Sequence, residues 1–232
     1  MPTVREVCHA ALALLALYGI GLRAQEHGEK VARGPDRTQE DKRILGVIAA
    51  NKTVDEPSQA VGPMPFRDKL KLGAEDSFDP HGLPGLALSA AIGQWQNQYR
   101  SFGQGSRGFA KRYGEAFADQ AVGNMMVEAV FPRLLHEDPR YFRLAKGSLL
   151  RRAEYALSRV VITRTDSGGR NLNFTELLGN GAAAALSNLY HPAEYRSVSQ
   201  TMRRAGLTVL TDAPFNLLQE FWPDIRRKVF HK

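Results

Sequence analysis

An uninterrupted apolar run near the start of the chain is followed by a polar stretch and then by a long region with helical signals. The run extends from Ala10 to Leu22, 13 residues, which is too short to span a bilayer comfortably. Charged residues precede it and the small residue Ala24 follows it, as in a secretory signal peptide. We therefore expect residues 1–24 to be a signal peptide and the protein to be exported to the periplasm or cell envelope. The alternative is a single membrane-anchoring helix.

The next segment, residues 25–71, is polar and is interrupted by Pro57, Pro63 and Pro65. Its one apolar island is RILGVIAA, at 43–50. A polar segment broken by prolines buries too little apolar surface to form a core of its own. We expect an extended, flexible arm whose island docks on the body of the protein, and one helical domain over residues 72–232.

Start and stop signals for helices dominate the remaining sequence. Asp79 before Pro80 resembles an N-cap with proline at the first helical position, and Pro84 offers a second start of the same kind. Asn173 with Glu176 three residues later is a variant of the capping box. Together these signals predict helices over residues 80–101, 107–130, 132–144, 147–163, 173–190, 193–206 and 207–221. The alternative for one part is a hairpin of VVIT with NLNF around the turn RTDSGGR.

Small residues recur at a spacing of four, which places them on one face of a helix where a second helix can approach closely. These rows are Gly85, Ser89 and Gly93; Ala110, Gly114 and Ala118; and Gly179 with Ala183 and Gly181 with Ala185. Asn124 and Asn180 each follow a glycine inside an apolar helix, and buried amides need hydrogen-bond partners. With Glu176 they either fix helix packing or line a polar pocket. The predicted fold is all-α, a compact bundle of closely packed helices with an extended N-terminal arm.

Hydropathy favours helices that pack on one another rather than in a bilayer. After residue 24 no segment reaches about 18 uninterrupted apolar residues. Polar and charged side chains interrupt the apolar stretches, and a charge at the bilayer centre costs at least about 2.5 kcal/mol. We expect membrane contact to be limited to a surface. A multi-helix integral membrane protein is the alternative, and it would need apolar faces opposite the small-residue rows.

Composition excludes several kinds of chemistry. The only cysteine, Cys8, precedes the apolar run, so cleavage after residue 24 would leave none for disulfides, thiol catalysis or zinc. Removal of residues 1–24, with Arg5, Arg23 and Glu6, lowers the net charge from +7 to +6. An exported basic protein encounters anionic lipids and envelope polymers rather than nucleic acid.

Basic residues are concentrated between Arg133 and Arg170, where eight arginines and Lys146 accompany four acidic residues. Guanidinium groups match phosphate and carboxylate oxygens, and the interleaved aromatic rings suit a membrane interface. This pattern predicts a surface that binds anionic headgroups or envelope polymers. The predicted contact residues are Arg133, Arg140, Arg143, Arg151, Arg152, Arg159 and Arg164. The alternative is a solvated helix face with intramolecular ion pairs.

The segment FPRLLHEDPRYFR, residues 131–143, has the residue density of an active site. Its catalytic candidates are His136, Glu137, Asp138 and Arg140. Three of them are consecutive and would not face one another on a helix. A zinc-protease motif would need a second histidine at position 140, where the chain has Arg140, so that motif is absent. Asp138 before Pro139 also fits a helix N-cap. The candidate metal ligands are His136, His191 and Glu194, whose spacing matches no known metal motif. We expect no cofactor.

Five segments resemble a family of exported bacterial proteins of unknown function: DPRYFR, TRTDSG, NFTELLGN, SNLYHP and EFWPDI. The resemblance extends from RILGVIAAN through most of the remaining chain and implies export and one compact domain, but no activity. From these features together we expect a non-enzymatic envelope protein, monomeric or oligomeric, attached peripherally through its arginine-rich face. The alternative is an envelope hydrolase that acts on lipid or cell-wall material through the His136 region.

Overall fold

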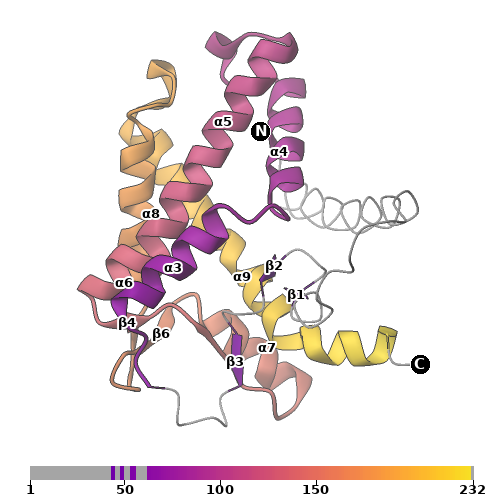
Figure 1. The fold of residues 1–232 in the computed structure, drawn as a ribbon, viewed down its shortest axis with the longest axis vertical. Helices are drawn as coiled ribbons and strands as arrows, with labels where there is room; N and C mark the ends of the chain where they lie inside the picture. Colours follow the sequence, from indigo (N-terminus) through magenta and orange to yellow (C-terminus); the bar gives the residue numbers. More distant parts are fainter. Residues whose placement is uncertain (1–42, 45–47, 50–52, 56–61, 231–232) are drawn as a thin grey trace.

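The structure, a computed structural model, describes residues 43–44, 48–49, 53–55 and 62–230. The predicted signal peptide and most of the predicted arm lie outside these residues. The described part is mostly helical, with helices packed together and small sheets (Figure 1). The helical prediction is confirmed, whereas the all-α class is wrong in detail because short strands join segments far apart in the chain.

Seven helices are present in the described residues: α3 (Phe66–Ser77), α4 (Leu83–Trp95), α5 (Gly105–Asn124), α6 (Phe131–Leu134), α7 (Leu149–Ser158), α8 (Phe174–Ser187) and α9 (Val198–Phe230). A π-helical segment, η3 (Met125–Val130), joins α5 to α6, and two 3-10 turns are η2 (Arg100–Phe102) and η4 (Ala193–Tyr195). Helices α3, α4 and α8 pack on α5, and α9 packs against α8 and α7 (Figure 1). Helix α5 therefore lies at the centre of the helical part.

Local signals explain several helix boundaries. The side chain of Asn173 accepts a hydrogen bond of 3.0 Å from the backbone N–H of Glu176, so the predicted cap of α8 is confirmed. Helix α4 begins at Leu83 with Pro84 in its first turn, and not at Pro80. Helix α3 begins at Phe66, inside the segment assigned to the arm.

The predicted break between residues 206 and 207 is wrong. Helices expected over 193–206 and 207–221 are one continuous helix, α9, which contains Pro214 and Pro223. Each proline removes one backbone hydrogen bond. Packing of α9 against α7 and α8 compensates for that loss, which local signals could not reveal.

The helix predicted over 132–144 is also wrong. Helix α6 ends at Leu134, His136 has a positive φ of 56°, and two strands follow, β4 (Glu137–Asp138) and β5 (Tyr141–Arg143). A helix through Pro139 would lose the bond to residue 135 and clash with its carbonyl group. In place of a helix, this segment forms strands that pair with strands from elsewhere in the chain.

The strands of the described residues form three small sheets. β4 pairs antiparallel with β6 (Ile162–Thr165), and β6 pairs antiparallel with β7 (Arg170–Leu172), which confirms the hairpin alternative. β5 pairs in parallel with β3 (Thr53–Asp55). Within the apolar island, β1 (Arg43–Ile44) pairs with β2 (Ile48–Ala49).

Close packing at small residues occurs at some of the predicted positions. A Cβ atom added at Gly179 would lie 3.1 Å from Cγ2 of Val127, so α8 approaches η3 closely there. A Cβ atom added at Gly93 would lie 3.2 Å from Oε1 of Gln98. At Gly85, Gly114 and Gly181 no atom from another segment of the described chain lies within 4 Å of that position, so these glycines do not mediate close helix contacts there.

The interior contains large charged side chains. Lys69, Arg112, Glu137, His191 and Glu220 are among the largest fully buried side chains of the described residues. Buried charges need ion pairs and hydrogen bonds to offset their desolvation. In the part of the chain that is described, none of the helices is both long enough and apolar enough to cross a membrane.

Candidate metal centre

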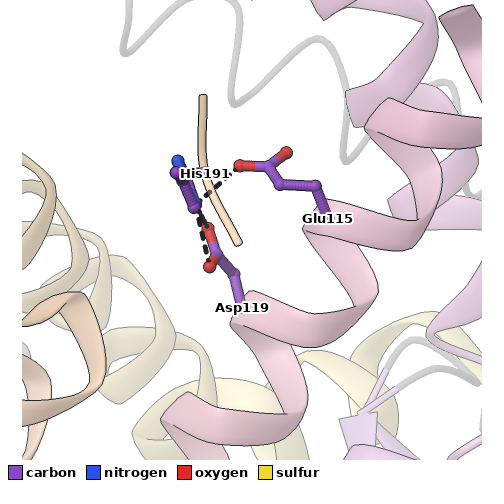
Figure 2. Close-up of side chains that lie close together, drawn as sticks. All are labelled: Glu115, Asp119 and His191. Carbon is purple, nitrogen blue, oxygen red and sulfur yellow. Dashed lines mark hydrogen bonds and ion pairs between the residues drawn. The ribbon is translucent and has the colours of Figure 1, made fainter. Parts of the chain in front are cut away.

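Two carboxylates of α5 and a histidine distant from them in sequence converge between α5 and the segment after α8 (Figure 2). Glu115 and Asp119, four residues apart, lie on one face of α5. Nε2 of His191 lies 2.8 Å from Oε1 of Glu115 and 3.1 Å from each carboxylate oxygen of Asp119. The three ligand atoms, one nitrogen and two oxygens, lie within 4.8 Å of one another.

The chain around His191 fixes the position of its ring. The backbone N–H of His191 donates to the carbonyl of Ser187, at the end of α8, over 2.9 Å. Nε of Arg196 donates to the carbonyl of His191 over 2.7 Å. The ring of Tyr99 packs edge-on against the imidazole, with centroids 5.4 Å apart. His191 is therefore fully buried, whereas Asp119 is partly exposed.

Two tyrosines support the carboxylates. The hydroxyl group of Tyr190 donates to Oδ1 of Asp119 over 2.6 Å, and Tyr99 forms a side-chain hydrogen bond with Glu115. Burial, followed by the nearby carboxylates, raises the pKa of each tyrosine above its ordinary value. Both hydroxyl groups therefore remain protonated donors, which orient the carboxylate oxygens toward His191.

The protonation of His191 is set by opposing effects. Burial lowers its pKa, but hydrogen bonds to Asp119 and Glu115 and their negative charges outweigh burial and raise the pKa to about 9. Nδ1 has no hydrogen-bond partner within the described residues. At neutral pH the cluster without a cation is an imidazolium ion held by two carboxylates. A metal ion would take the place of the proton on Nε2.

Both carboxylates also line a cavity of about 270 Å³ between α4 and α5. Polar groups of Ser89, Gln98 and Tyr99 share this wall. Arg112 lies there too, but it donates to the backbone carbonyls of Gln98, Gly103 and Gly108. The cavity therefore gives an ion at the carboxylates room for water or for a small ligand.

Among the metal candidates named from the sequence, only His191 belongs to this cluster. His136 is exposed in the turn before β4, and Glu194 is exposed in η4. Hydrogen bonds from its own backbone and from Ser101 lower the pKa of Glu194. Sequence reasoning missed Glu115 and Asp119, although two carboxylates four residues apart on a helix were a readable signal.

The catalytic candidates do not form one reactive set. His136 is exposed, whereas Glu137 and Asp138 are buried. Asp138 is not the predicted helix N-cap, because it lies in β4, where its Oδ1 accepts hydrogen bonds from the backbone N–H and from Nε of Arg140, at 3.0 and 2.9 Å. Glu137 accepts a hydrogen bond from the backbone N–H of Thr175. This segment is held together by structural contacts.

The seven predicted anion-binding arginines are divided between interior and surface. Arg140, Arg143 and Arg152 are committed to Asp138 or Glu220. Two others, half-buried, lie over aromatic rings: Arg159 over Tyr155 and Arg164 over Phe142. Arg133 and Arg151 are exposed. The arginine-rich segment thus contributes less to the surface than its charge suggests.

Of the polar residues expected to fix helix packing or to line a pocket, Glu176 lines a cavity of about 180 Å³. Asn180 is buried, and its side chain donates to the backbone carbonyl of Glu176 over 2.9 Å and to the Glu176 carboxylate. Both bonds lie within α8. Asn124 is half-buried at the end of α5, and its backbone oxygen is 3.3 Å from the position of a Cβ at Gly73.

Comparison of the chain with family models, curated proteins and solved structures found no match. The family resemblance drawn from the sequence therefore stays a prediction.

Proposed function

We propose that this protein binds a divalent transition-metal ion through Glu115, Asp119 and His191. The observation that carries the proposal is the convergence of one imidazole nitrogen and two carboxylate oxygens within 4.8 Å, from positions up to 76 residues apart in the numbering of the chain. Ligand sets of mixed nitrogen and oxygen suit Zn²⁺, Mn²⁺, Fe²⁺ or Co²⁺ better than the all-oxygen preference of Ca²⁺ and Mg²⁺.

Charge balance supports the same ligand. With a neutral imidazole, the two carboxylates carry a charge of −2, which a divalent ion neutralises. Tyr99 and Tyr190 donate to these carboxylates, as outer-shell partners of metal ligands commonly do. The rival interpretation is a purely structural imidazolium ion pair with one negative charge in excess, which the nearby Arg204 partly offsets.

The open side of the cluster supports a chemical use for the ion. Three protein ligands leave coordination positions free, as in catalytic zinc sites. These positions would face the cavity lined by Ser89 and Gln98. A metal-bound water has a lowered pKa and is a good nucleophile at neutral pH. The proposed site would therefore support hydrolysis. This is the activity of the alternative function predicted from the sequence, but it would take place at the metal centre and not in the His136 region.

Titration with Co²⁺ tests the proposal. We expect the full chain, after treatment with a chelator, to bind one equivalent of Co²⁺ and to develop visible absorption bands of low-symmetry coordination. Zn²⁺ should abolish these bands by displacing Co²⁺. Absorption spectroscopy and isothermal titration calorimetry measure both steps. Absence of saturable binding would show that the cluster is an ion pair only.

A second function, peripheral attachment to an anionic membrane, is favoured by the exposed start of α7. Leu149 and Leu150 are 73% and 70% exposed, and the exposed basic residues Lys146 and Arg151 flank them. Apolar side chains beside basic ones are typical of segments that lie in the headgroup region of a membrane. In this proposal the protein is peripheral to the membrane, as the sequence predicts. Fewer arginines contact the headgroups than the seven predicted from the sequence.

Vesicle binding tests this second function. Exchange of Leu149 and Leu150 for glutamate is expected to lower partition to vesicles with phosphatidylserine by roughly tenfold or more, because burial of a leucine contributes about 1.5–3 kcal/mol. Added salt should also weaken binding. Co-sedimentation measures partition, and Leu177→Glu, at an exposed leucine of α8, is the matched control. An equal loss in the control variant, or equal binding to neutral vesicles, would contradict the assignment.

A further inference from the structure

A second cavity, of about 180 Å³, lies apart from the candidate metal centre. Its walls come from the β4 and β5 region, from β6, from the start of α8 and from the middle of α9. Residues 137–142, which the sequence singled out for their density of polar groups, form one side of it. The Glu115, Asp119 and His191 cluster does not contribute to these walls.

Glu137 is the most deeply buried acidic group of this cavity, at 1% exposure. Its Oε2 accepts a hydrogen bond of 3.0 Å from the backbone N–H of Thr175, in the first turn of α8. Its Oε1 has no hydrogen-bond partner among the described residues, and neither has Oγ1 of Thr175, which lines the same cavity. Buried polar atoms without partners carry a free-energy penalty, so a ligand that pairs with them is favoured.

The cavity also offers a positive group. Arg159 contributes to its wall, its guanidinium lies 4.8 Å from the centre of the Tyr155 ring, and its buried Nε has no acceptor within the described chain. Glu128, buried in the π-helical segment η3, lines the cavity as well. Segments of π-helix often occur at functional sites. One cavity therefore combines carboxylates and a hydroxyl group with an unpaired guanidinium N–H.

We propose that this cavity binds a small zwitterion, a free α-amino acid with an apolar side chain. Its ammonium group would donate to Oε1 of Glu137 and to Oγ1 of Thr175. Its carboxylate would accept from Nε of Arg159. Val127, Ile162 and Phe215 supply apolar wall for the side chain. A ligand with a single charge leaves either the acceptors or the donor unpaired.

Calorimetric titration with L-valine tests the proposal, with isobutylamine and isovalerate as controls. Isobutylamine is valine without its carboxylate, and isovalerate is valine without its amino group. The full chain is expected to bind L-valine at least tenfold more tightly than either control. Equal affinity for L-valine and isobutylamine would overturn the role of Arg159, and absence of L-valine binding would overturn the proposal.

Two variants separate binding from folding. Glu137→Gln keeps the acceptor for the Thr175 N–H but removes the charge, and Thr175→Val removes only the hydroxyl group. Each is expected to weaken L-valine binding tenfold or more while Co²⁺ binding at His191 is retained. Glu154→Gln, at an exposed position of α7, is the control and should bind L-valine as the parent does. Unchanged L-valine affinity in both cavity variants would overturn the site.

Discussion

Replacement of His191 by alanine is expected to weaken Co²⁺ binding by at least about 100-fold, because outer-shell changes alone cost 10- to 100-fold in other metal sites. The variant removes the only nitrogen ligand of the cluster. Asp119→Asn should have a comparable effect, since a neutral amide oxygen is a poorer ligand for a divalent ion than a carboxylate. Competition with a coloured chelator measures the affinities.

Two further variants make this prediction specific. Tyr190→Phe keeps all three ligands and removes the hydrogen bond to Asp119, so a loss of roughly tenfold is expected. His136→Asn changes an exposed histidine outside the cluster, and asparagine tolerates the positive φ of that position. Its Co²⁺ affinity should equal that of the parent chain. If His136→Asn and His191→Ala lost affinity equally, surface binding rather than the cluster would account for the metal.

Stability measurements distinguish a metal site from a structural ion pair. An ion that binds only the folded state raises stability by about 2.7 kcal/mol at a concentration 100 times its Kd. Zn²⁺ should therefore raise the Tm of the parent chain and leave that of Asp119→Asn nearly unchanged. In the ion-pair interpretation, Asp119→Asn lowers the Tm, but Zn²⁺ has no effect on either protein.

Local signals predicted the helices better than the strands. The Asn173 cap of α8 and the π-helical continuation of α5 both fall within predicted helices, because capping and apolar spacing act over a few residues. The strands β4 and β5 were predicted as helix. Their partners β6 and β3 lie distant in sequence, and such pairing leaves no local pattern beyond Pro139.

The candidate metal centre was only partly readable from the sequence. His191 was a candidate ligand, but it was grouped with His136 and Glu194, which the fold leaves exposed and apart from the cluster. Its true neighbours come from α5, 72 and 76 residues earlier in the chain numbering. Charge counting failed for a related reason, because Arg143 and Arg152 were counted as surface although the fold places them around Glu220.

Glu220→Ala is expected to be the most destabilising single substitution, by about 3–5 kcal/mol, the cost of removing one partner of a buried ion pair. The fully buried carboxylate accepts hydrogen bonds from Nε of Arg152 at 2.8 Å and from the hydroxyl group of Tyr141 at 3.2 Å. It also accepts hydrogen bonds from the backbone N–H groups of Leu144 and Ala145, both at 3.0 Å. The variant leaves all four donors without this acceptor.

Urea unfolding of the parent and variant chains measures this loss of stability. Glu154→Ala, at an exposed acidic position of α7, is the control and should stay within about 0.5 kcal/mol of the parent. A loss for Glu220→Ala below about 1 kcal/mol would show that water replaces the carboxylate and that the network contributes little. Since Glu220 joins β5, α7 and α9, whereas the candidate metal ligands lie on α5 and after α8, the folded fraction of Glu220→Ala should still bind Co²⁺ as the parent chain does.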